Sequence, residues 1–381
     1  MNDPVTRWPE IQTLFEQALD RPPDERTAWL RSVCGDDLEV YREVEALLEG
    51  DRDQHTVFAG SALDLLAPAD LEDALVPSKT GERVGPWVLG ERIGAGGMGA
   101  VYRAQRADGF EQTAALKRIK PGMDSEAVLA RFRAERQILA RLEHPGIARL
   151  LDGGLAGDGR PYFAMELVEG EPITDYCDGL GLEVDERLRL FVEVCDAVAY
   201  AHRQLVVHRD LKPSNVLVTD LEDGTRQVKL LDFGIARVLS DDHGDGLTRT
   251  GQRVLTPSYA APEQHRGESP STATDAYALG VLLYRLLTGT LPTEDKGELA
   301  ALSTSVPTEP SRPSTRVQDA ATRRDLEGDL DTIILKALRL EPERRYGSAA
   351  ELGADVRRYL EDVPIEARPA TAGYRARLFV R

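Results

Sequence analysis

Two short apolar runs that each lead into an aspartate constrain this chain more than any other feature. The first run opens the segment VVHRDLKPSNVLV at residues 206–218, and the second, residues 228–231, ends at Asp232-Phe233-Gly234. Either motif alone is unremarkable. Both together, in this order and each after an expected short strand, indicate a folded core in which two strand ends deliver polar side chains to one site.

The polar residues of these two segments suit a phosphate group and a metal ion. Asp210 can accept the proton of an attacking hydroxyl, and Lys212 can neutralise a transferred phosphoryl group. Asn215 can ligate Mg²⁺, and Asp232, seventeen residues further along, supplies a carboxylate for the metal. Asp210 is therefore the candidate catalytic carboxylate, with Asn215 and Asp232 as candidate metal ligands.

A glycine-rich run, IGAGGMGAV, occupies residues 93–101 between two expected strands. Glycines let the backbone approach phosphates closely, but the same spacing occurs in dinucleotide-binding folds and in ordinary glycine turns. A dinucleotide site needs a helix directly after the glycines. Residues 100–107 are strand-like instead, which favours a strand–loop–strand flap lying over a nucleotide.

Lys117 follows the glycine run in an apolar strand, where burying a lysine is costly unless an anion meets it. Lysines at strand ends are common, so Lys117 by itself leaves an ordinary structural role open. Glu135 shares the apolar stripe of an expected helix, residues 124–141, with Phe132. Because a carboxylate on an apolar face needs a cation nearby, we expect a Lys117–Glu135 ion pair.

The 381 residues are enough for two or three domains, and four segments differ in their residue pattern. Residues 1–50 predict an acidic three-helix module, and residues 51–84 lose this periodicity and are interpreted as a linker. Residues 85–362 predict a β-rich lobe followed by a larger helical lobe, and residues 363–381 form a C-terminal extension. The expected strands are residues 87–93, 100–107, 112–119, 216–219 and 228–231.

The net charge of −18 is unevenly placed, because residues 1–80 hold 7 basic and 18 acidic residues. A chain this acidic is a poor candidate for sequence-independent nucleic-acid binding, which needs basic surface to neutralise phosphates. We interpret the acidity as solvated surface, with a basic docking partner for the N-terminal module as the alternative.

Three cysteines, an odd number without metal-ligand spacing, fit a reducing compartment with free thiols. The N-terminus has no secretory-signal pattern, and the strongest apolar stretch, residues 279–287, is too short to span a bilayer. We therefore expect a soluble chain located in the cytoplasm.

These motifs resemble those of the eukaryotic-type protein kinase family, specifically bacterial serine/threonine kinases, from about residue 87 to residue 360. The resemblance implies an α+β, bilobal fold with a β-rich N-lobe and a helical C-lobe, preceded here by the small all-α module. It also implies ATP in the cleft, Mg²⁺ or Mn²⁺ as the metal, and transfer of the γ-phosphoryl group to serine or threonine hydroxyls of proteins. Lys212 and Thr256, both placed to touch Asp210, point to serine and threonine rather than tyrosine.

The resemblance also assigns roles to individual residues. Catalytic roles are assigned to Asp210, Lys212, Lys117 and Glu135, and metal binding to Asn215 and Asp232. Nucleotide binding is assigned to Ile93, Gly94, Ala95, Gly96, Gly97, Met98, Gly99, Val101, Ala115, Lys117, Met165, Glu166, Val168 and Leu217. In this set Met165 would be the gatekeeper, and Glu166 to Val168 the hinge that hydrogen-bonds adenine.

Three structural contacts are implied as well. His208 would brace Phe233 in the assembled active core. Asp275 would hold the catalytic loop from beneath, and Glu263 would pair with Arg345 near the C-terminus.

Arg209 directly precedes Asp210, an arrangement seen in kinases whose activation loop is ordered by phosphorylation, because a phosphate can hydrogen-bond such an arginine. We expect one copy of the chain to phosphorylate Thr248, Thr250 or both in the activation loop of another copy. The alternative is that these threonines stay unmodified. In the family, glycine usually precedes the threonine that corresponds to Thr256, whereas this chain has Leu255 there. This difference removes no catalytic group. The candidate regulatory residues are Arg209, Thr248, Thr250 and Thr256.

Two alternatives to an active protein kinase are a small-molecule kinase and a pseudokinase scaffold that binds nucleotide or partners without transfer. The complete substrate-loop segment, residues 256–263, argues against the first, and the presence of every essential side chain argues against the second. Relatives often continue into a membrane span. A place as the cytoplasmic part of a longer membrane-anchored protein is therefore the alternative to a purely cytoplasmic location.

Overall fold

A computed structural model of the chain describes residues 80–96, 99–109, 111–119, 126–221, 223–233, 257–292 and 310–369, and six residues nearer the N-terminus. Within these ranges it leaves out the side chains of residues 95, 96, 126–128, 131, 135 and 257. The chain divides into two units, Met1–Leu71 and Glu72–Arg381.

In the unit Met1–Leu71, the six described residues are helical. Leu30 and Val44 are fully buried, and Tyr41 is nearly so. The Arg31 guanidinium donates from Nε to the Tyr41 hydroxyl over 3.2 Å. The three buried residues belong to the apolar faces of two of the three helices that the sequence predicts here. The rest of the predicted module, and the linker up to residue 79, lie outside the described residues.

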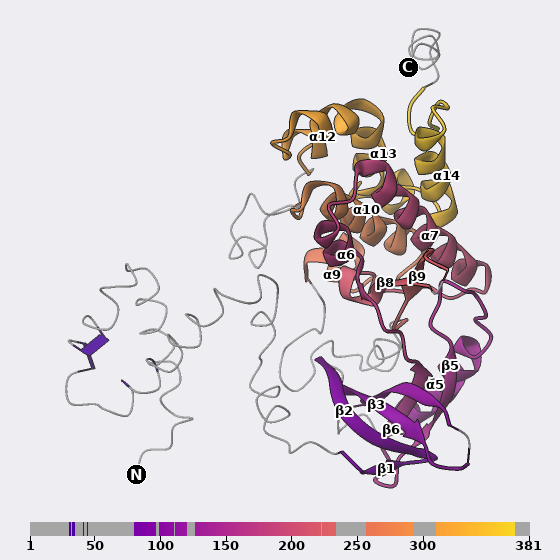
Figure 1. Cartoon of the computed structure of the whole chain (residues 1–381). Coiled ribbons are helices and arrows are strands. Elements are labelled where there is room, and N and C mark those ends of the chain that lie inside the picture. The colour runs from indigo at the N-terminus through magenta and orange to yellow at the C-terminus, as the bar shows by residue number, and fades with distance from the viewer. Residues whose placement is uncertain are drawn as a thin grey trace. The chain divides into compact units, whose positions relative to one another are not determined.

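The N-lobe of the second unit is built on a six-stranded antiparallel sheet (Figure 1). In spatial order its strands are β1 (Arg83–Val84), β2 (Trp87–Gly96), β3 (Gly99–Arg106), β4 (Thr113–Ile119), β6 (Pro161–Glu166) and β5 (Leu150–Leu155). Strand β1 falls in the segment that the sequence assigned to the linker. It pairs with β2, and Val84 is fully buried, so the sheet begins before residue 85.

The register of the strands sorts side chains onto two faces of this sheet. Val101 lies opposite Lys117, and Ala115 lies opposite Met165. Because side chains alternate along a strand, these four share one face. The other face packs into its own apolar cluster, made of Val84, Trp87, Leu89, Tyr102, Ala104, Ala114, Leu116, Ala156, Tyr162 and Ala164.

One helix, α5 (Glu126–Leu139), packs on the face that carries Lys117. Its Phe132 ring lies 4.6 Å from the ring of Phe163, which is the register partner of Lys117. This contact fixes α5 beside the predicted nucleotide-binding face. The helix confirms the one expected over residues 124–141 and is shorter at both ends.

The C-lobe is mainly helical. Its helices are α6 (Ile173–Gly179), α7 (Val184–Arg203), α9 (Pro262–His265), α10 (Thr272–Thr288), α12 (Ala320–Asp325), α13 (Asp331–Ala337) and α14 (Ala349–Leu360). Short 3₁₀ or π turns are η3 (Pro213–Asn215), η4 (Pro257–Tyr259), η6 (Pro313–Thr315), η7 (Leu326–Leu330) and η8 (Pro342–Arg344). A small sheet has the order β7 (Glu171–Pro172), β8 (Val216–Asp220) and β9 (Arg226–Leu230).

Helix α10 is the buried centre of this lobe, and its ends are set by local sequence. At its start the Ser271 amide donates to the Thr274 hydroxyl over 2.9 Å. At its end Gly289 adopts φ 74°, the left-handed conformation that glycine accepts without strain. Between these caps, apolar side chains occupy nearly the whole circumference, so the helix is buried on most sides.

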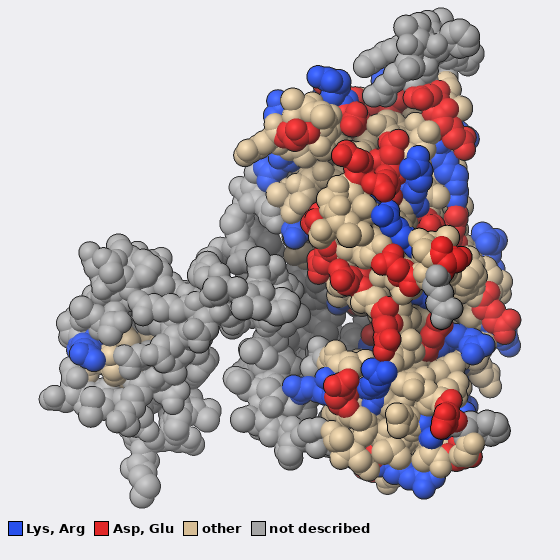
Figure 2. All heavy atoms as spheres, in the orientation of Figure 1, with Lys and Arg blue, Asp and Glu red and all other residues tan. Residues whose placement is uncertain are grey.

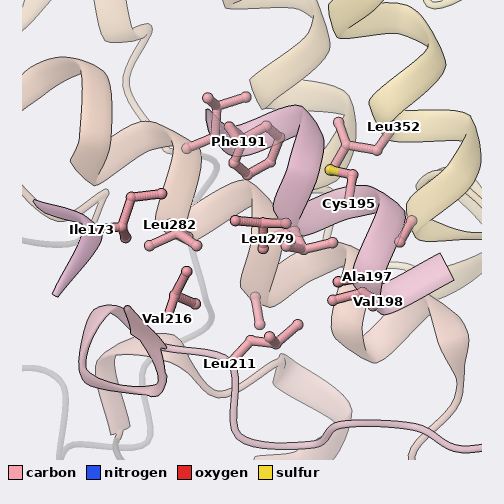
Figure 3. Packing of buried hydrophobic residues seen from close by; sticks show 14 of the residues in the cluster. Ile173, Phe191, Cys195, Ala197, Val198, Leu211, Val216, Leu279, Leu282 and Leu352 are labelled. Carbon is pink, nitrogen blue, oxygen red and sulfur yellow. The ribbon is translucent and has the colours of Figure 1, made fainter. Parts of the chain in front are cut away.

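The core of the C-lobe reaches directly beneath the catalytic loop. Figure 3 shows Leu279 and Leu282 of α10 beside Phe191 of α7, with Leu211 at the edge of the same cluster. Leu211 is 1% exposed and follows Asp210 in sequence. The loop that carries Asp210 is therefore anchored in the hydrophobic core by its own next residue.

The segment before the catalytic loop corrects one prediction, because residues 206–207 form no strand. The amides of Gln204 and Val206 both donate to the Ala201 carbonyl at the end of α7, over 2.9 and 3.0 Å. Leu205 adopts φ 62° between them, in the position where a glycine commonly ends a helix. The Val206 amide, which a strand would use, is thus taken up by the end of the preceding helix.

The start of the predicted C-terminal extension packs onto α14. Asp355 is fully buried and accepts hydrogen bonds from the Tyr346 hydroxyl and from the amides of Glu366 and Ala367, over 2.9, 2.6 and 2.8 Å. Ile365 is 2% exposed. The chain is therefore held to the C-lobe a few residues beyond 362.

None of the helices in the described part of the chain combines the length and hydropathy that a bilayer span requires. On the face shown in Figure 2, basic and acidic side chains are intermixed over both lobes.

Candidate active site

The catalytic loop is held by a single buried carboxylate, that of Asp275 in α10. Its Oδ2 accepts from the His208 amide over 2.7 Å and lies 2.8 Å from Nε2 of His202, while Oδ1 accepts from the Arg209 amide over 2.9 Å. Asp275 is 1% exposed. The predicted role of Asp275 beneath the loop is confirmed, whereas the contact between His202 and Asp275 was not predicted.

His208 links the two motif segments. Its Nε2 lies 2.9 Å from the Leu231 carbonyl oxygen, and its ring lies 4.6 Å from the ring of Phe233. Complete burial lowers the pKa of His208, so the ring is neutral and Nε2 carries the proton that it donates. The predicted contact between His208 and Phe233 is confirmed.

Asp210, Lys212 and Asn215 form one connected group. Lys212 Nζ lies 3.2 Å from Asp210 Oδ2, and the Asn215 amide donates to the same oxygen over 3.2 Å. The Asn215 amide also reaches the Asp210 carbonyl oxygen at 2.8 Å. The turn η3 brings Asn215 back toward Asp210, because the Asn215 backbone amide bonds to the Lys212 carbonyl. The structure thus brings these three predicted residues together.

Asp232 stands at the end of the second segment, directly beside this group. The Leu231 amide donates to the Asn215 carbonyl oxygen over 2.9 Å, which joins the two segments through their backbones. Asp232 Oδ2 pairs with Lys117 Nζ at 2.7 Å. The sequence predicted Glu135 as the partner of Lys117. The backbone of Glu135 lies in α5, but its side chain lies outside the described residues.

The other oxygen of Asp232 suits a metal ion. Oδ1 is buried and has no hydrogen-bond partner among the described residues. A buried carboxylate oxygen without a partner is costly, and a cation would satisfy it. No group of three or more His, Cys, Asp or Glu side chains suited to a metal occurs in the described ranges. A site with few protein ligands is typical of Mg²⁺, which takes its remaining ligands from phosphates and water.

Backbone strain gathers at this site. Arg209 has φ 67° and Asp232 has φ 42°, both in the left-handed region that residues other than glycine rarely adopt. Such conformations cost about 1–3 kcal/mol each and persist only where surrounding contacts hold them. Arg209 directly precedes Asp210, and Asp232 is itself the second aspartate that the sequence singles out.

Four of the predicted nucleotide-binding residues, Val101, Ala115, Lys117 and Met165, share one face of the N-lobe sheet, and Leu217 lies in the separate C-lobe sheet. Val101, Ala115 and Met165 are half-buried, whereas the other face of these strands is buried at Tyr102, Ala114, Leu116 and Ala164. Leu217 of β8 is half-buried in the same way. Ile93 is 46% exposed at the start of the glycine run. Among the other residues assigned to nucleotide binding, Glu166 and Val168 are half-buried.

The glycine run itself forms the ends of β2 and β3. Gly94 pairs with Val101, and Gly96 pairs with Gly99 across the turn. Gly99 has φ 147°, and a Cβ added there would lie 2.0 Å from the Arg118 carbonyl oxygen. The packing of β3 against β4 therefore requires glycine at this position, in addition to any role near phosphate. Gly97 and Met98, and the side chain of Ala95, lie outside the described residues.

Glu166, in the predicted hinge, forms an ion pair that the sequence did not predict. Glu166 Oε1 lies 2.7 Å from Nζ of Lys229, and Glu166 Oε2 accepts from the Arg149 amide over 3.2 Å. Lys229 sits in β9 opposite Leu217, three residues before Asp232. The signal available in the sequence was a lysine among the apolar residues of the expected strand 228–231. The pair joins the predicted hinge to β9, the strand that leads to the candidate metal ligand Asp232.

The end of the substrate loop is fixed to the C-lobe. Glu263 and Arg345 form the predicted pair, with two bonds of 2.7 Å between buried side chains. Burial alone would raise the pKa of Glu263, but the bonds from Arg345 outweigh it and the pKa lies below its ordinary value. The activation-loop residues Thr248, Thr250, Leu255 and Thr256 lie outside the described residues.

Comparison with known proteins agrees with this geometry. Residues 87–355 match the family described as the protein kinase domain. The chain is 35% identical over 277 residues to the serine/threonine-protein kinase PknB of Mycobacterium tuberculosis, a match that covers 71% of this chain and 42% of that protein. It is 36% identical over 264 residues to the serine/threonine-protein kinase pkn3 of Myxococcus xanthus, covering 68% and 47%. The match thus spans less than half the length of these relatives.

Solved structures give the same assignment. The crystal structure of the Mycobacterium tuberculosis PknI kinase domain is similar with a TM-score of 0.56 at 28% sequence identity, covering 74% of this chain and 98% of that one. The N-lobe sheet and helical C-lobe therefore form the predicted bilobal kinase fold, and the two motif segments meet at its candidate active site. The chain belongs to the protein kinase family and is homologous to bacterial serine/threonine kinases.

Proposed function

We propose that this chain is an active serine/threonine protein kinase that transfers the γ-phosphoryl group of ATP to protein hydroxyls with Mg²⁺ as its metal ion. Membership of the family implies the use of ATP, a divalent metal ion and protein substrates. One observation carries the proposal. The bonded group of Asp210, Lys212 and Asn215 is joined through the Leu231 amide to Asp232, whose buried Oδ1 lacks a partner.

The proposed roles follow from chemistry at stated atoms. Asp210 orients the substrate hydroxyl and accepts its proton at a carboxylate oxygen. Lys212 places its ammonium group beside that carboxylate, where it offsets negative charge on the transferred group. Lys117 binds nucleotide phosphates from the sheet face of the N-lobe and is oriented by Glu135, the partner that the sequence predicts.

Asn215 and Asp232 are the proposed metal ligands, through the Asn215 side-chain oxygen and the Asp232 carboxylate. A bound Mg²⁺ neutralises charge on the phosphates during transfer. The adenine ring is proposed to lie between Val101 and Ala115 above and Leu217 below, bounded by the gatekeeper Met165. These four side chains are half-buried, as expected for the walls of an open cleft.

The test is phosphate incorporation from radiolabelled Mg²⁺-ATP into the chain and into a degenerate serine/threonine peptide library. We expect transfer by the unmodified protein, and at least a thousandfold slower transfer by Asp210→Asn, which keeps the size of the side chain but loses the base. Phosphoamino-acid analysis should give phosphoserine and phosphothreonine without phosphotyrosine. Nucleotide binding without transfer in the unmodified protein would instead favour the pseudokinase scaffold.

Regulation by the activation loop is proposed from Arg209. Arg209 directly precedes Asp210 and has a left-handed backbone. Phosphate on Thr248 or Thr250 would add charge-assisted hydrogen bonds to the Arg209 side chain. Thr256 is proposed to contact Asp210 and Lys212. The double variant Thr248→Ala/Thr250→Ala should lose most activity after pre-incubation with ATP, and an unchanged rate would contradict this regulation.

Three further proposals concern the rest of the chain. Trans-autophosphorylation requires self-association, which would make the rate of autophosphorylation rise with the square of protein concentration. The acidic module, residues 1–50, is proposed as an interaction module for a basic partner, and the part of the predicted linker before β1 as its tether. Removing residues 1–71, up to the boundary between the two units, should change activity if the module regulates it.

The chain is proposed to act in the cytoplasm, by itself or as the cytoplasmic part of a longer membrane-anchored protein.

A further inference from the structure

Gln264 makes two side-chain hydrogen bonds that no motif predicts. Its Oε1 accepts from the Ala261 amide over 2.9 Å, and its Nε2 donates to the Arg209 carbonyl oxygen over 3.1 Å. Gln264 belongs to the short helix α9 and directly follows the buried Glu263. One side-chain amide therefore joins the end of the substrate loop to the residue that precedes Asp210.

The Arg209 backbone needs support on both sides. Its left-handed φ of 67° is costly for a residue other than glycine. The peptide before Arg209 is held because its amide donates to Asp275 in α10. The peptide after Arg209 is held because its carbonyl accepts from Gln264 in α9. These two contacts come from different helices and fix the peptide planes on either side of the strained residue.

The second of these peptides is the one that aims Asp210. It consists of the Arg209 carbonyl and the Asp210 amide, and the amide lies at a long 3.4 Å from Nδ1 of His208. The Gln264 bond to the carbonyl is shorter, at 3.1 Å. Rotation of this peptide would swing the Asp210 side chain, and a misplacement of about 1 Å can cost about a hundredfold in rate.

Glutamine is suited to this position in a way that glutamate is not. At the third residue of a helix either side chain can accept from the amide that precedes the helix. Only glutamine also offers N–H donors, because an ionised glutamate is purely an acceptor. Gln264→Glu can therefore keep the bond from the Ala261 amide, but it replaces the bond to the Arg209 carbonyl oxygen by a repulsive contact between two acceptors.

We propose that Gln264 is a positioning residue that fixes the Arg209–Asp210 peptide and couples the end of the substrate loop to the catalytic aspartate. The proposal rests on the proposed function, since it takes Asp210 as the catalytic base. A substrate loop that is correctly seated holds Ala261 and α9 in place. Through the Gln264 amide, this seating orients the carboxylate that receives the hydroxyl proton.

The experiment compares Gln264→Glu with Gln264→Met and with the matched control Gln318→Glu, an exposed site before α12. For each full-length protein we would measure kcat and KM with the peptide library, the Kd for ATP, and the thermal midpoint. Amide hydrogen exchange at Asp210 would report directly on the peptide that Gln264 holds.

Gln264→Glu should lower kcat about tenfold, with the ATP Kd and the peptide KM within about twofold of the unmodified protein. Exchange at the Asp210 amide should become about tenfold faster, and the thermal midpoint should stay within about 2 °C. Gln264→Met should show the same fall in kcat and an additional fall in the midpoint, because it also loses the bond to Ala261. Gln318→Glu should change none of these quantities.

Three results would overturn the inference: a kcat of Gln264→Glu within twofold of the unmodified protein, unchanged exchange at Asp210, or a loss of kcat that only follows a loss of folded protein. Failure of the proposed function is distinguishable, because the unmodified protein would then transfer no phosphate. The exchange at Asp210 would still report whether Gln264 holds the peptide.

Discussion

Arg345 binds Glu263 through two parallel bonds, Nη1 to Oε1 and Nη2 to Oε2, each 2.7 Å long. The side chains are 0% and 3% exposed. The remaining guanidinium N–H groups donate to the carbonyl oxygens of Arg339, Ala273 and Leu340. All five donors of the guanidinium are used, so the charge is buried without an unsatisfied group. This pair joins the end of the substrate loop to the segment after α13.

Breaking this pair should be costly. Glu263→Gln leaves the buried guanidinium without its anion, and we expect a loss of about 3–5 kcal/mol in the free energy of unfolding. Chemical denaturation measures this quantity. Glu268→Gln, which removes a bond to Arg266 on the exposed surface, should change it by less than about 1 kcal/mol. A similar small change for Glu263→Gln would show that the buried pair does not stabilise the lobe.

His208 should make stability depend on pH. Its folded pKa is lowered by burial, so only the unfolded chain binds a proton at mildly acidic pH. The stability present above the unfolded pKa, about 6.5, is therefore lost as pH falls below it, by up to about 1.4 kcal/mol per pH unit. Denaturation at pH 7.0 and pH 5.5 measures this loss. His208→Phe should reduce the difference, and an undiminished difference in this variant would contradict the role of His208.

Two glycines of the same motif should differ in what they tolerate. A Cβ at Gly99 would lie 2.0 Å from the Arg118 carbonyl oxygen, whereas at Gly94 the nearest atom would be Val101 Cβ at 3.7 Å, an ordinary contact. We expect Gly99→Ala to lower the free energy of unfolding by about 3 kcal/mol. Gly94→Ala should change it by less than about 1 kcal/mol. Equal effects of the two substitutions in the same denaturation assay would contradict the structural requirement at Gly99.

The Glu166–Lys229 pair should tune nucleotide affinity. Lys229→Met removes the cation that holds the hinge carboxylate, and we expect KM for ATP to rise about threefold with kcat little changed. Because Glu166 is about one-third exposed, the coupling energy should be modest, about 0.5 kcal/mol. A double-mutant cycle with Glu166→Gln measures it. Strictly additive effects of the two substitutions would show that the contact does not act on the hinge.

The sequence predicted the parts of this fold that depend on pattern. Short β-rich runs predicted β2, β3, β4, β8 and β9 but not β1, β5, β6 or β7. The resemblance to protein kinases implied that Asp275 holds the catalytic loop and that Glu263 pairs with Arg345. The prediction of a strand at residues 206–207 was wrong because apolar composition does not reveal where backbone donors go. Those donors are used at the end of α7, close to Ala201.

Contacts between segments distant in sequence were harder to predict. Lys229 and Glu166 are 63 residues apart, and Gln264 and Arg209 are 55 residues apart. Lys229 stands out as a lysine in an apolar run, but neither pair carries a pattern that identifies both partners, because each contact depends on how strands and helices are brought together in three dimensions. His202 likewise contacts Asp275, which lies 73 residues further along the chain. These residues could be recognised only once the register and the helix packing were known.

The register of β3, β4 and β6 limits which changes in chain length this lobe can accept. Lys117 shares its face with Val101 and Met165 only because side chains alternate with a period of two. One residue inserted within β4 before Lys117 would turn its ammonium group toward the apolar cluster around Leu116 and remove it from the cleft. Residues inserted in the turn between β3 and β4 would leave that parity intact, so a peptide tag or a reporter placed there should preserve the nucleotide site.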